Sequence, residues 1–212
     1  MLTRLKQKVQ QLMFSEAKAA HRIGLTPNIV TIIGFSIAIL SAVAYGLTTP
    51  QQPMWLIVAV ILLMASGFCD TLDGVLARTY QQASHFGGFL DSLLDRYADA
   101  FVLAGVIISG ASTIISATFS LFVGLAAIAS SFMVSYSRAR AEAAGIKMES
   151  IGIAERPERI IILAVASLFA FFWLPALIIG IIIIAVFATL TVSQRVLHVY
   201  KVLKNIENKP TV

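Results

Sequence analysis

Long apolar stretches alternate with short polar ones along most of this 212-residue chain. A helix that crosses a bilayer needs about 20 mostly apolar residues, and six stretches approach that length. The predicted spans cover residues 29–47, 54–70, 87–108, 114–136, 160–173 and 176–192. The fifth is short for a full span unless its helix starts near Glu155, and Pro175 separates it from the sixth. The pattern therefore predicts an all-α membrane protein with six transmembrane helices.

The N-terminal residues follow a different pattern. Apolar side chains recur there at helical spacing, with lysines between them, from Leu2 to Ala17. This pattern predicts an amphipathic helix that lies in the membrane interface, with its lysines near anionic headgroups. A helix packed on the other cytoplasmic loops is the alternative. We therefore divide the chain into an amphipathic juxtamembrane segment (1–25), a six-helix transmembrane catalytic domain (26–205) and a short polar tail (206–212).

Composition and charge support a membrane protein. The chain is 58% hydrophobic and 13% charged, whereas about a quarter of the residues in a soluble domain are charged. All sixteen Lys and Arg residues fall within 4–22, 78–96, 138–159 and 195–209. With six spans these segments share one side, and the positive-inside rule places both termini and the active site on the cytoplasmic side of the cell membrane. Topology thus explains the net charge of +5, and no nucleic-acid partner is expected.

All five aspartates of the chain lie within thirty residues, at positions 70, 73, 91, 95 and 99. Acidic side chains near a bilayer are costly and mark functional sites by default. On helices, Asp70 and Asp73 share one face, as do Asp91 and Asp95. Two antiparallel helices would join these four carboxylates into a site for divalent cations, Mg²⁺ or Mn²⁺. Asp99 lies about 12 Å along the helix from Asp91, which favours a structural, hydrogen-bonded role over metal ligation.

Small residues and one arginine accompany the acids at fixed offsets. Gly74, Ala77 and Gly87 leave room for a ligand to approach the backbone, and Arg78 supplies a forked donor suited to phosphate. The complete motif reads Asp70-x2-Asp73-Gly74-x2-Ala77-Arg78, then eight residues, then Gly87-x3-Asp91-x3-Asp95. It resembles, at every position, the signature of the CDP-alcohol phosphotransferase (CDP-alcohol phosphatidyltransferase) family.

This resemblance implies a six-span homodimer and a set of residue roles. Asp70, Asp73 and Asp91 would ligate two divalent cations, and Asp95 would complete the metal site and act as general base. The residues implied in binding the CDP-lipid are Asn28, Thr31, Gly74, Ala77, Arg78, Ser84 and Gly87. For Asn28 and Thr31 the alternative is that they cap and pack the first span.

The family resemblance also implies the reaction. A hydroxyl of a polar acceptor attacks the lipid-side phosphorus of CDP-diacylglycerol or CDP-archaeol, and CMP leaves. The string from Arg138 to Glu142 and the string from Glu155 to Arg159 resemble the branch that makes phosphatidylinositol phosphate or archaetidylinositol phosphate. This implies 1L-myo-inositol 1-phosphate as acceptor, with its phosphate bound by Arg138, Arg140, Arg156 and Arg195. Arg159 and Glu142 are further candidates.

Two alternative functions compete with this interpretation. Phosphatidylglycerol phosphate synthase, with glycerol 3-phosphate as acceptor, needs a similar arginine pocket, and only the string resemblance disfavours it. An ion transporter also carries intramembrane carboxylates, but it predicts acids near the bilayer midplane on broken helices. The choice between diacylglycerol and archaeol donors, and between Mg²⁺ and Mn²⁺, stays open.

Overall fold

The computed structural model describes residues 13–109, 116–148 and 151–207. Its regular secondary structure within these ranges is helical, which confirms the predicted all-α class. The helices are α2 (Phe14–Arg22), α3 (Pro27–Gly46), α4 (Met54–Thr79), α5 (His85–Ile108), α6 (Ala117–Ala143), α7 (Arg156–Ala170) and α8 (Pro175–Glu207).

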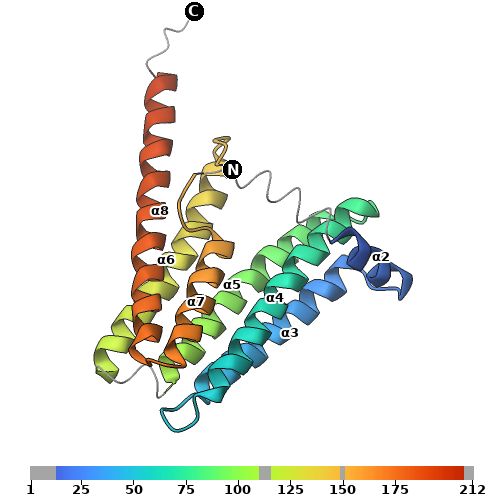
Figure 1. The fold of residues 1–212 in the computed structure, drawn as a ribbon. Helices are drawn as coiled ribbons and strands as arrows, with labels where there is room; N and C mark the ends of the chain where they lie inside the picture. The colour runs from blue at the N-terminus through green and yellow to red at the C-terminus, as the bar shows by residue number, and fades with distance from the viewer. Residues whose placement is uncertain (1–12, 110–115, 149–150, 208–212) are drawn as a thin grey trace, which may run out of the picture.

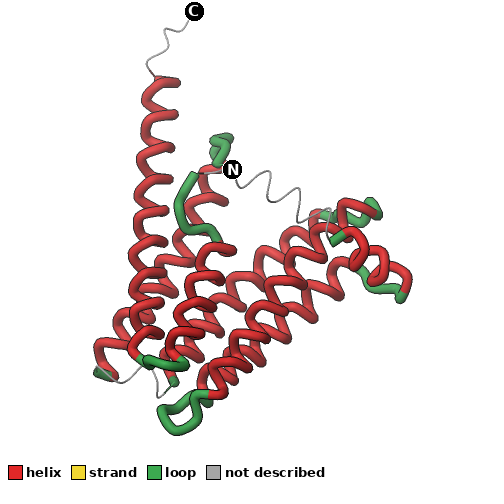
Figure 2. Tube along the Cα trace, in the orientation of Figure 1, coloured by secondary structure: helices red, strands yellow, loops and turns green. Residues whose placement is uncertain are grey.

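The six longer helices form two groups of three (Figures 1 and 2). Helix α3 packs on α4 and α5, whereas α8 packs on α6 and α7; contacts of α4 with α7 and of α5 with α6 join the groups. The groups lie close at one end and diverge at the other, where α2 and the α6–α7 connection are found (Figure 1). The described parts of the basic segments lie in α2, the end of α4, the end of α6, the start of α7 and the end of α8, which are all toward this divergent end.

Local signals in the sequence determine where the helices of the first group begin. Pro27 stands at the first turn of α3, and the Thr26 hydroxyl caps that helix by accepting the Ile29 N–H. Ser84 caps α5 in the same way, accepting the Gly87 N–H at 3.0 Å. A side chain at Gly105 would collide with the backbone of Ala42, so glycine permits the close approach of α5 to α3.

Four of the described helices are long and apolar enough to cross a membrane: Pro27–Gly46, Met54–Thr79, Ala117–Ala143 and Pro175–Asn205. The predicted count of six is therefore not confirmed among the described helices. Helix α5 has 24 residues, but Asp91, Asp95, Arg96 and Asp99 make it too polar for this class. Helix α7 begins beside Glu155, but with 15 residues it is still shorter than a full span.

Part of the N-terminal segment lies outside the described residues, which begin at Met13. In the described part, α2 buries Ala17 and Ala20 in a cluster with Leu72 and Leu76 of α4. The ring of His21 also stacks on that of Tyr80, with centroids 3.7 Å apart. Helix α2 is thus fastened to the end of α4 that follows the first pair of aspartates.

Candidate active site

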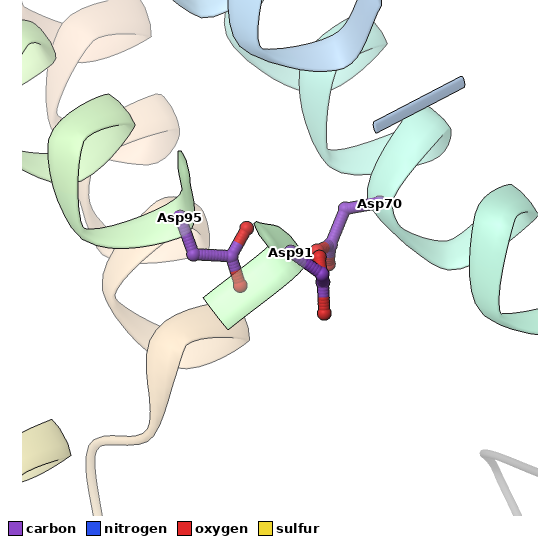
Figure 3. A group of neighbouring side chains, drawn as sticks. All are labelled: Asp70, Asp91 and Asp95. Atoms are coloured by element: carbon purple, nitrogen blue, oxygen red, sulfur yellow. The ribbon is translucent and has the colours of Figure 1, made fainter. Parts of the chain in front are cut away.

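Three of the predicted metal ligands come together where α4 and α5 approach each other. Carboxylate oxygens of Asp70, Asp91 and Asp95 all lie within 4.8 Å of one another. Asp91 and Asp95 stand one helical turn apart, so both side chains leave α5 on the same face. Figure 3 shows them converging with Asp70 of α4. The sequence spacing predicted this meeting of the two helices.

Asp73, the fourth predicted ligand, lies beside this group. It is 6% exposed, and its Oδ2 accepts a hydrogen bond from the Thr31 hydroxyl at 2.6 Å. Asp73 and Thr31 line one small cavity together with Asp70, Asp91 and Asp95. Thr31 therefore orients an acidic side chain of the site, beyond packing the first span.

The carboxylate group fits a hard divalent cation. Oxygen donors are the ligands that such ions select, and this cavity gathers four carboxylates from two helices. Asp91 Oδ1 is buried and has no hydrogen-bond partner. A buried, unsatisfied carboxylate oxygen is costly unless it is compensated, and coordination to a cation would compensate it. The residues present therefore suit a metal.

Arg156 links the carboxylate group to the rest of the molecule. Its Nη1 is 2.7 Å from both Asp70 Oδ1 and Asp95 Oδ1, and its Nε donates to Asp99 Oδ1 at 3.2 Å. Arg159, one turn further along α7, donates from Nη2 to Asp99 Oδ2 at 2.5 Å. Asp99 is thus ion-paired with both arginines. It is not among the three clustered ligands, as its distance along the helix predicted.

A larger cavity of about 420 Å³ adjoins the carboxylates on the side of α6 and α8. Three of the four predicted acceptor-binding arginines line it: Arg138, Arg156 and Arg195. Asp95 lines it as well, so the predicted base borders both cavities. Arg140 is exposed and lies outside the residues that line this cavity. Helical geometry explains this, because residues two apart project from different faces.

Arg195 is the most deeply held of these arginines. Its side chain is 2% exposed, and it donates from Nε to the Ile151 carbonyl at 2.9 Å and from Nη1 to the Val134 carbonyl. Its Nη2 is 3.3 Å from Glu155 Oε1. Arg195 therefore ties α6 and the α6–α7 connection to α8, in addition to lining the cavity.

The residues implied in CDP-lipid binding form two small groups. Asn28, at the start of α3, faces the start of α5: a Cβ added to Gly87 would lie 2.8 Å from Asn28 Oδ1 and 3.0 Å from Ser84 Oγ. A side chain at position 87 would therefore displace one or both of these polar groups. On α4, the Arg78 guanidinium folds back over Gly74, where an added Cβ would lie 3.3 Å from Nη2. Ala77 is half-buried on the same helix.

Sequence reasoning missed several residues of the larger cavity. Ser92 and Arg96 line it from α5, and Ser135 lines it from α6. Ser92 and Arg96 each follow a signature aspartate by one position, so the same helical spacing could have placed them together. Thr191, which fixes the connection leading to Arg156, carried no signal in the sequence.

Thr191 gives a stability prediction. Its buried Oγ1 accepts the N–H groups of Ile153 at 3.2 Å and Ala154 at 3.0 Å. Thr191→Val keeps the shape but leaves these donors without a partner, which should lower the free energy of unfolding by about 1–3 kcal/mol. Reversible unfolding in mild detergent measures this, and Thr191→Ser, which keeps the oxygen, is the matched control. A valine variant as stable as the serine variant would contradict the assignment.

Comparison with known proteins agrees with the geometry of this site. The model of the family described as CDP-alcohol phosphatidyltransferase matches residues 24–194, so the chain belongs to this family. It is 42% identical over 201 residues to archaetidylinositol phosphate synthase of Pyrococcus horikoshii, covering 95% of this chain and 97% of that protein. It is 37% identical over 185 residues to phosphatidylinositol phosphate synthase of Mycolicibacterium smegmatis, covering 85% and 80% of the two chains.

Solved structures show the same fold. The crystal structure of Mycobacterium tuberculosis phosphatidylinositol phosphate synthase with CDP-DAG bound matches with a TM-score of 0.76 and 31% identity, covering 90% of this chain and 94% of that one. The same enzyme in complex with manganese and citrate matches with a TM-score of 0.75 at 31% identity, covering 88% of both chains. The family resemblance seen in the motif is thereby confirmed.

Proposed function

We propose that this protein transfers the phosphatidyl or archaetidyl group of a CDP-linked lipid to a hydroxyl of 1L-myo-inositol 1-phosphate and releases CMP. The observation that supports this proposal most strongly is that two adjacent cavities share lining residues. A group of carboxylates suited to divalent cations borders an arginine-lined cavity of about 420 Å³, and Asp95 belongs to both. The relatives named as inositol phosphate lipid synthases support this acceptor.

The same proposal includes a membrane topology. Helices α5 and α7 would complete six spans with the four long apolar helices, because both lie parallel to them within the two groups (Figure 1). Both termini and the active site would face the cytoplasm, as the basic segments at the divergent end require. Segment 1–25 would lie at the interface, 26–205 would form the catalytic domain and 206–212 the tail. The family resemblance supports a homodimer.

Two divalent cations, Mg²⁺ or Mn²⁺, would be held by Asp70, Asp73, Asp91 and Asp95. Cations bound there would neutralise charge on the diphosphate and on the leaving CMP. A relative crystallised with manganese and citrate supports such a site.

The donor and the acceptor would approach Asp95 from opposite sides. The CDP group would contact residues at the starts of α3 and α5 and at the end of α4, namely Asn28, Thr31, Gly74, Ala77, Arg78, Ser84 and Gly87. The acceptor phosphate would contact Arg138, Arg156 and Arg195 in the larger cavity, because guanidinium groups bind phosphate in a forked geometry. Arg140 would contribute from the exposed rim of α6.

In the proposed step, Asp95 accepts the proton of the acceptor hydroxyl as that oxygen attacks the lipid-side phosphorus. The bond from this phosphorus to the bridging oxygen breaks, and CMP leaves with the bridging oxygen and its electron pair. Arg78 and the cations would offset the charge that develops on CMP. Most of the rate enhancement would come from positioning and preorganised charge.

A substitution at Arg195 should affect the KM of the acceptor and the KM of the donor differently. Arg195→Ala should raise the acceptor KM by about tenfold or more, because a hydrogen bond to a charged group is worth about 1.5–3 kcal/mol. The CDP-lipid KM should change far less, since Arg195 lines the larger cavity and none of the residues implied in donor binding does. Steady-state CMP release measures both. Because Arg195 also ties three segments together, thermal stability is compared in parallel. Equal changes in both KM values would remove Arg195 from the acceptor pocket.

An acceptor panel tests the proposed function. Purified protein with CDP-diacylglycerol or CDP-archaeol and Mg²⁺ is offered inositol 1-phosphate, glycerol 3-phosphate, free inositol or serine. The proposal predicts CMP release with inositol 1-phosphate alone. Release with glycerol 3-phosphate alone would keep the mechanism but replace the acceptor. If folded protein releases no CMP with any of the four acceptors, the transferase function is contradicted.

A further inference from the structure

Asp99 is the one aspartate that the cation site and the family signature leave without a role. It lies on α5 one turn beyond Asp95, and its side chain is 18% exposed. It also lines the larger cavity. A partly buried carboxylate near a bilayer is costly unless it is paired. We therefore look for groups around Asp99 that compensate the cost of its charge.

The partners of Asp99 provide that compensation. Oδ1 accepts a hydrogen bond from Arg156 Nε at 3.2 Å, and Oδ2 accepts one from Arg159 Nη2 at 2.5 Å. Each oxygen thus holds a different arginine of α7. Arg159 is 6% exposed and also donates to the Ala154 carbonyl at 3.3 Å. Arg159 is therefore a fixed neighbour, and Asp99 joins it to Arg156.

Arg156 has two competing sets of partners. Its Nη1 is 2.7 Å from both Asp70 and Asp95, whereas only its Nε is held by Asp99. The same side chain lines the cavity of the carboxylate group and the larger arginine-lined cavity. Without a counter-charge on the far side, the guanidinium would be drawn toward the two carboxylates alone. Asp99 supplies that counter-charge.

We infer that Asp99 is a positioning residue, which holds Arg156 at the boundary between the cation site and the acceptor cavity. It acts through Arg156 and Arg159 and contacts neither the reacting phosphorus nor the attacking oxygen. In this way it sets the affinity for an anionic, phosphorylated acceptor. The inference rests on the proposed function, because it assigns the larger cavity to the acceptor.

The test compares the two substrates in an Asp99→Asn variant. Asparagine keeps the size but loses the charge, so the hydrogen bonds to both guanidinium groups weaken. We expect the acceptor KM to rise about tenfold, which is the loss of one charge-assisted hydrogen bond. The CDP-lipid KM and kcat should each change less than about threefold. Glu16→Gln, which removes a charge from the exposed face of α2, controls for net charge and should leave all three unchanged.

Two further variants separate positioning from a merely structural role. Asp99→Glu keeps the charge, so the fold is retained, but the longer side chain displaces the arginines. It should raise the acceptor KM by less than Asp99→Asn and leave the donor KM unchanged. In an Arg156→Ala background, Asp99→Asn should add little to the acceptor KM. Equal changes in both KM values, or an undiminished effect without Arg156, would overturn the inference.

The acceptor panel is run first on the unaltered protein. A failure of the proposed function can then be distinguished from a failure of the Asp99 inference. If glycerol 3-phosphate is the acceptor, the Asp99 variants are measured with it, and the same selective rise in acceptor KM is expected. Direct binding of inositol 1-phosphate or glycerol 3-phosphate by calorimetry gives a readout without turnover. Equal binding to the unaltered and Asp99→Asn proteins would refute the Asp99 inference while leaving the transferase function intact.

Discussion

Asp95→Asn should abolish turnover while largely sparing metal-dependent binding of the CDP-lipid. Asparagine cannot accept the proton of the acceptor hydroxyl, and general-base catalysis is worth about 10²–10⁴-fold in rate. Three other carboxylates, Asp70, Asp73 and Asp91, remain to hold cation and donor. We therefore expect kcat to fall by about 10²–10⁴-fold. CMP release measures turnover, and calorimetry with Mg²⁺ measures binding.

Asp99→Asn is the matched control for this experiment, because it makes the same substitution one helical turn away on the same helix. It should alter the acceptor KM and leave kcat nearly intact, whereas Asp95→Asn should remove kcat at saturating acceptor. Retained turnover in Asp95→Asn would show that another group accepts the proton. Loss of donor binding together with turnover would instead assign Asp95 to metal ligation alone.

Removal of divalent cations should stop the reaction reversibly. The carboxylate group contains a buried oxygen, Asp91 Oδ1, that has no hydrogen-bond partner, and cations held there would neutralise much of the charge of the diphosphate. Metal ions contribute several kcal/mol to such transfers, so EDTA should lower the rate by about 10²-fold or more. Excess Mg²⁺ or Mn²⁺ should restore it.

The control for chelation is EDTA loaded beforehand with Mg²⁺, which should leave the rate unchanged. Activity that persists in free EDTA, after exhaustive dialysis against it, would refute the two-cation mechanism. Restoration by one ion and not the other would decide between Mg²⁺ and Mn²⁺, which oxygen ligands alone do not distinguish.

The spacing of residues along single helices predicted much of this site. Asp91 and Asp95 share a helix face because they are four residues apart, and their meeting with Asp70 follows from two consecutive antiparallel helices. These are local properties, or properties of chain neighbours, and a single sequence contains them.

Contacts between distant segments could not be predicted in this way. Arg156 reaches Asp70 only because α7 packs on α4, across more than eighty residues of chain. The pairing of Asp99 with Arg159 and the hydrogen bonds to Thr191 likewise join segments that are far apart in the sequence. Arg140 belongs to a sequence string, from Arg138 to Glu142, that resembles the family. It nevertheless lies on the exposed face of α6 and does not line the larger cavity.

The measurement that tests the central claim most directly identifies the lipid product. Purified protein, CDP-diacylglycerol, Mg²⁺ and inositol 1-phosphate are incubated, and the lipids are analysed by mass spectrometry while CMP is quantified. We predict one new lipid that carries both the lipid phosphate and the inositol phosphate, formed in equal amount to CMP. Phosphatidic acid in equal amount to CMP would mean that water is the acceptor, and would contradict the account.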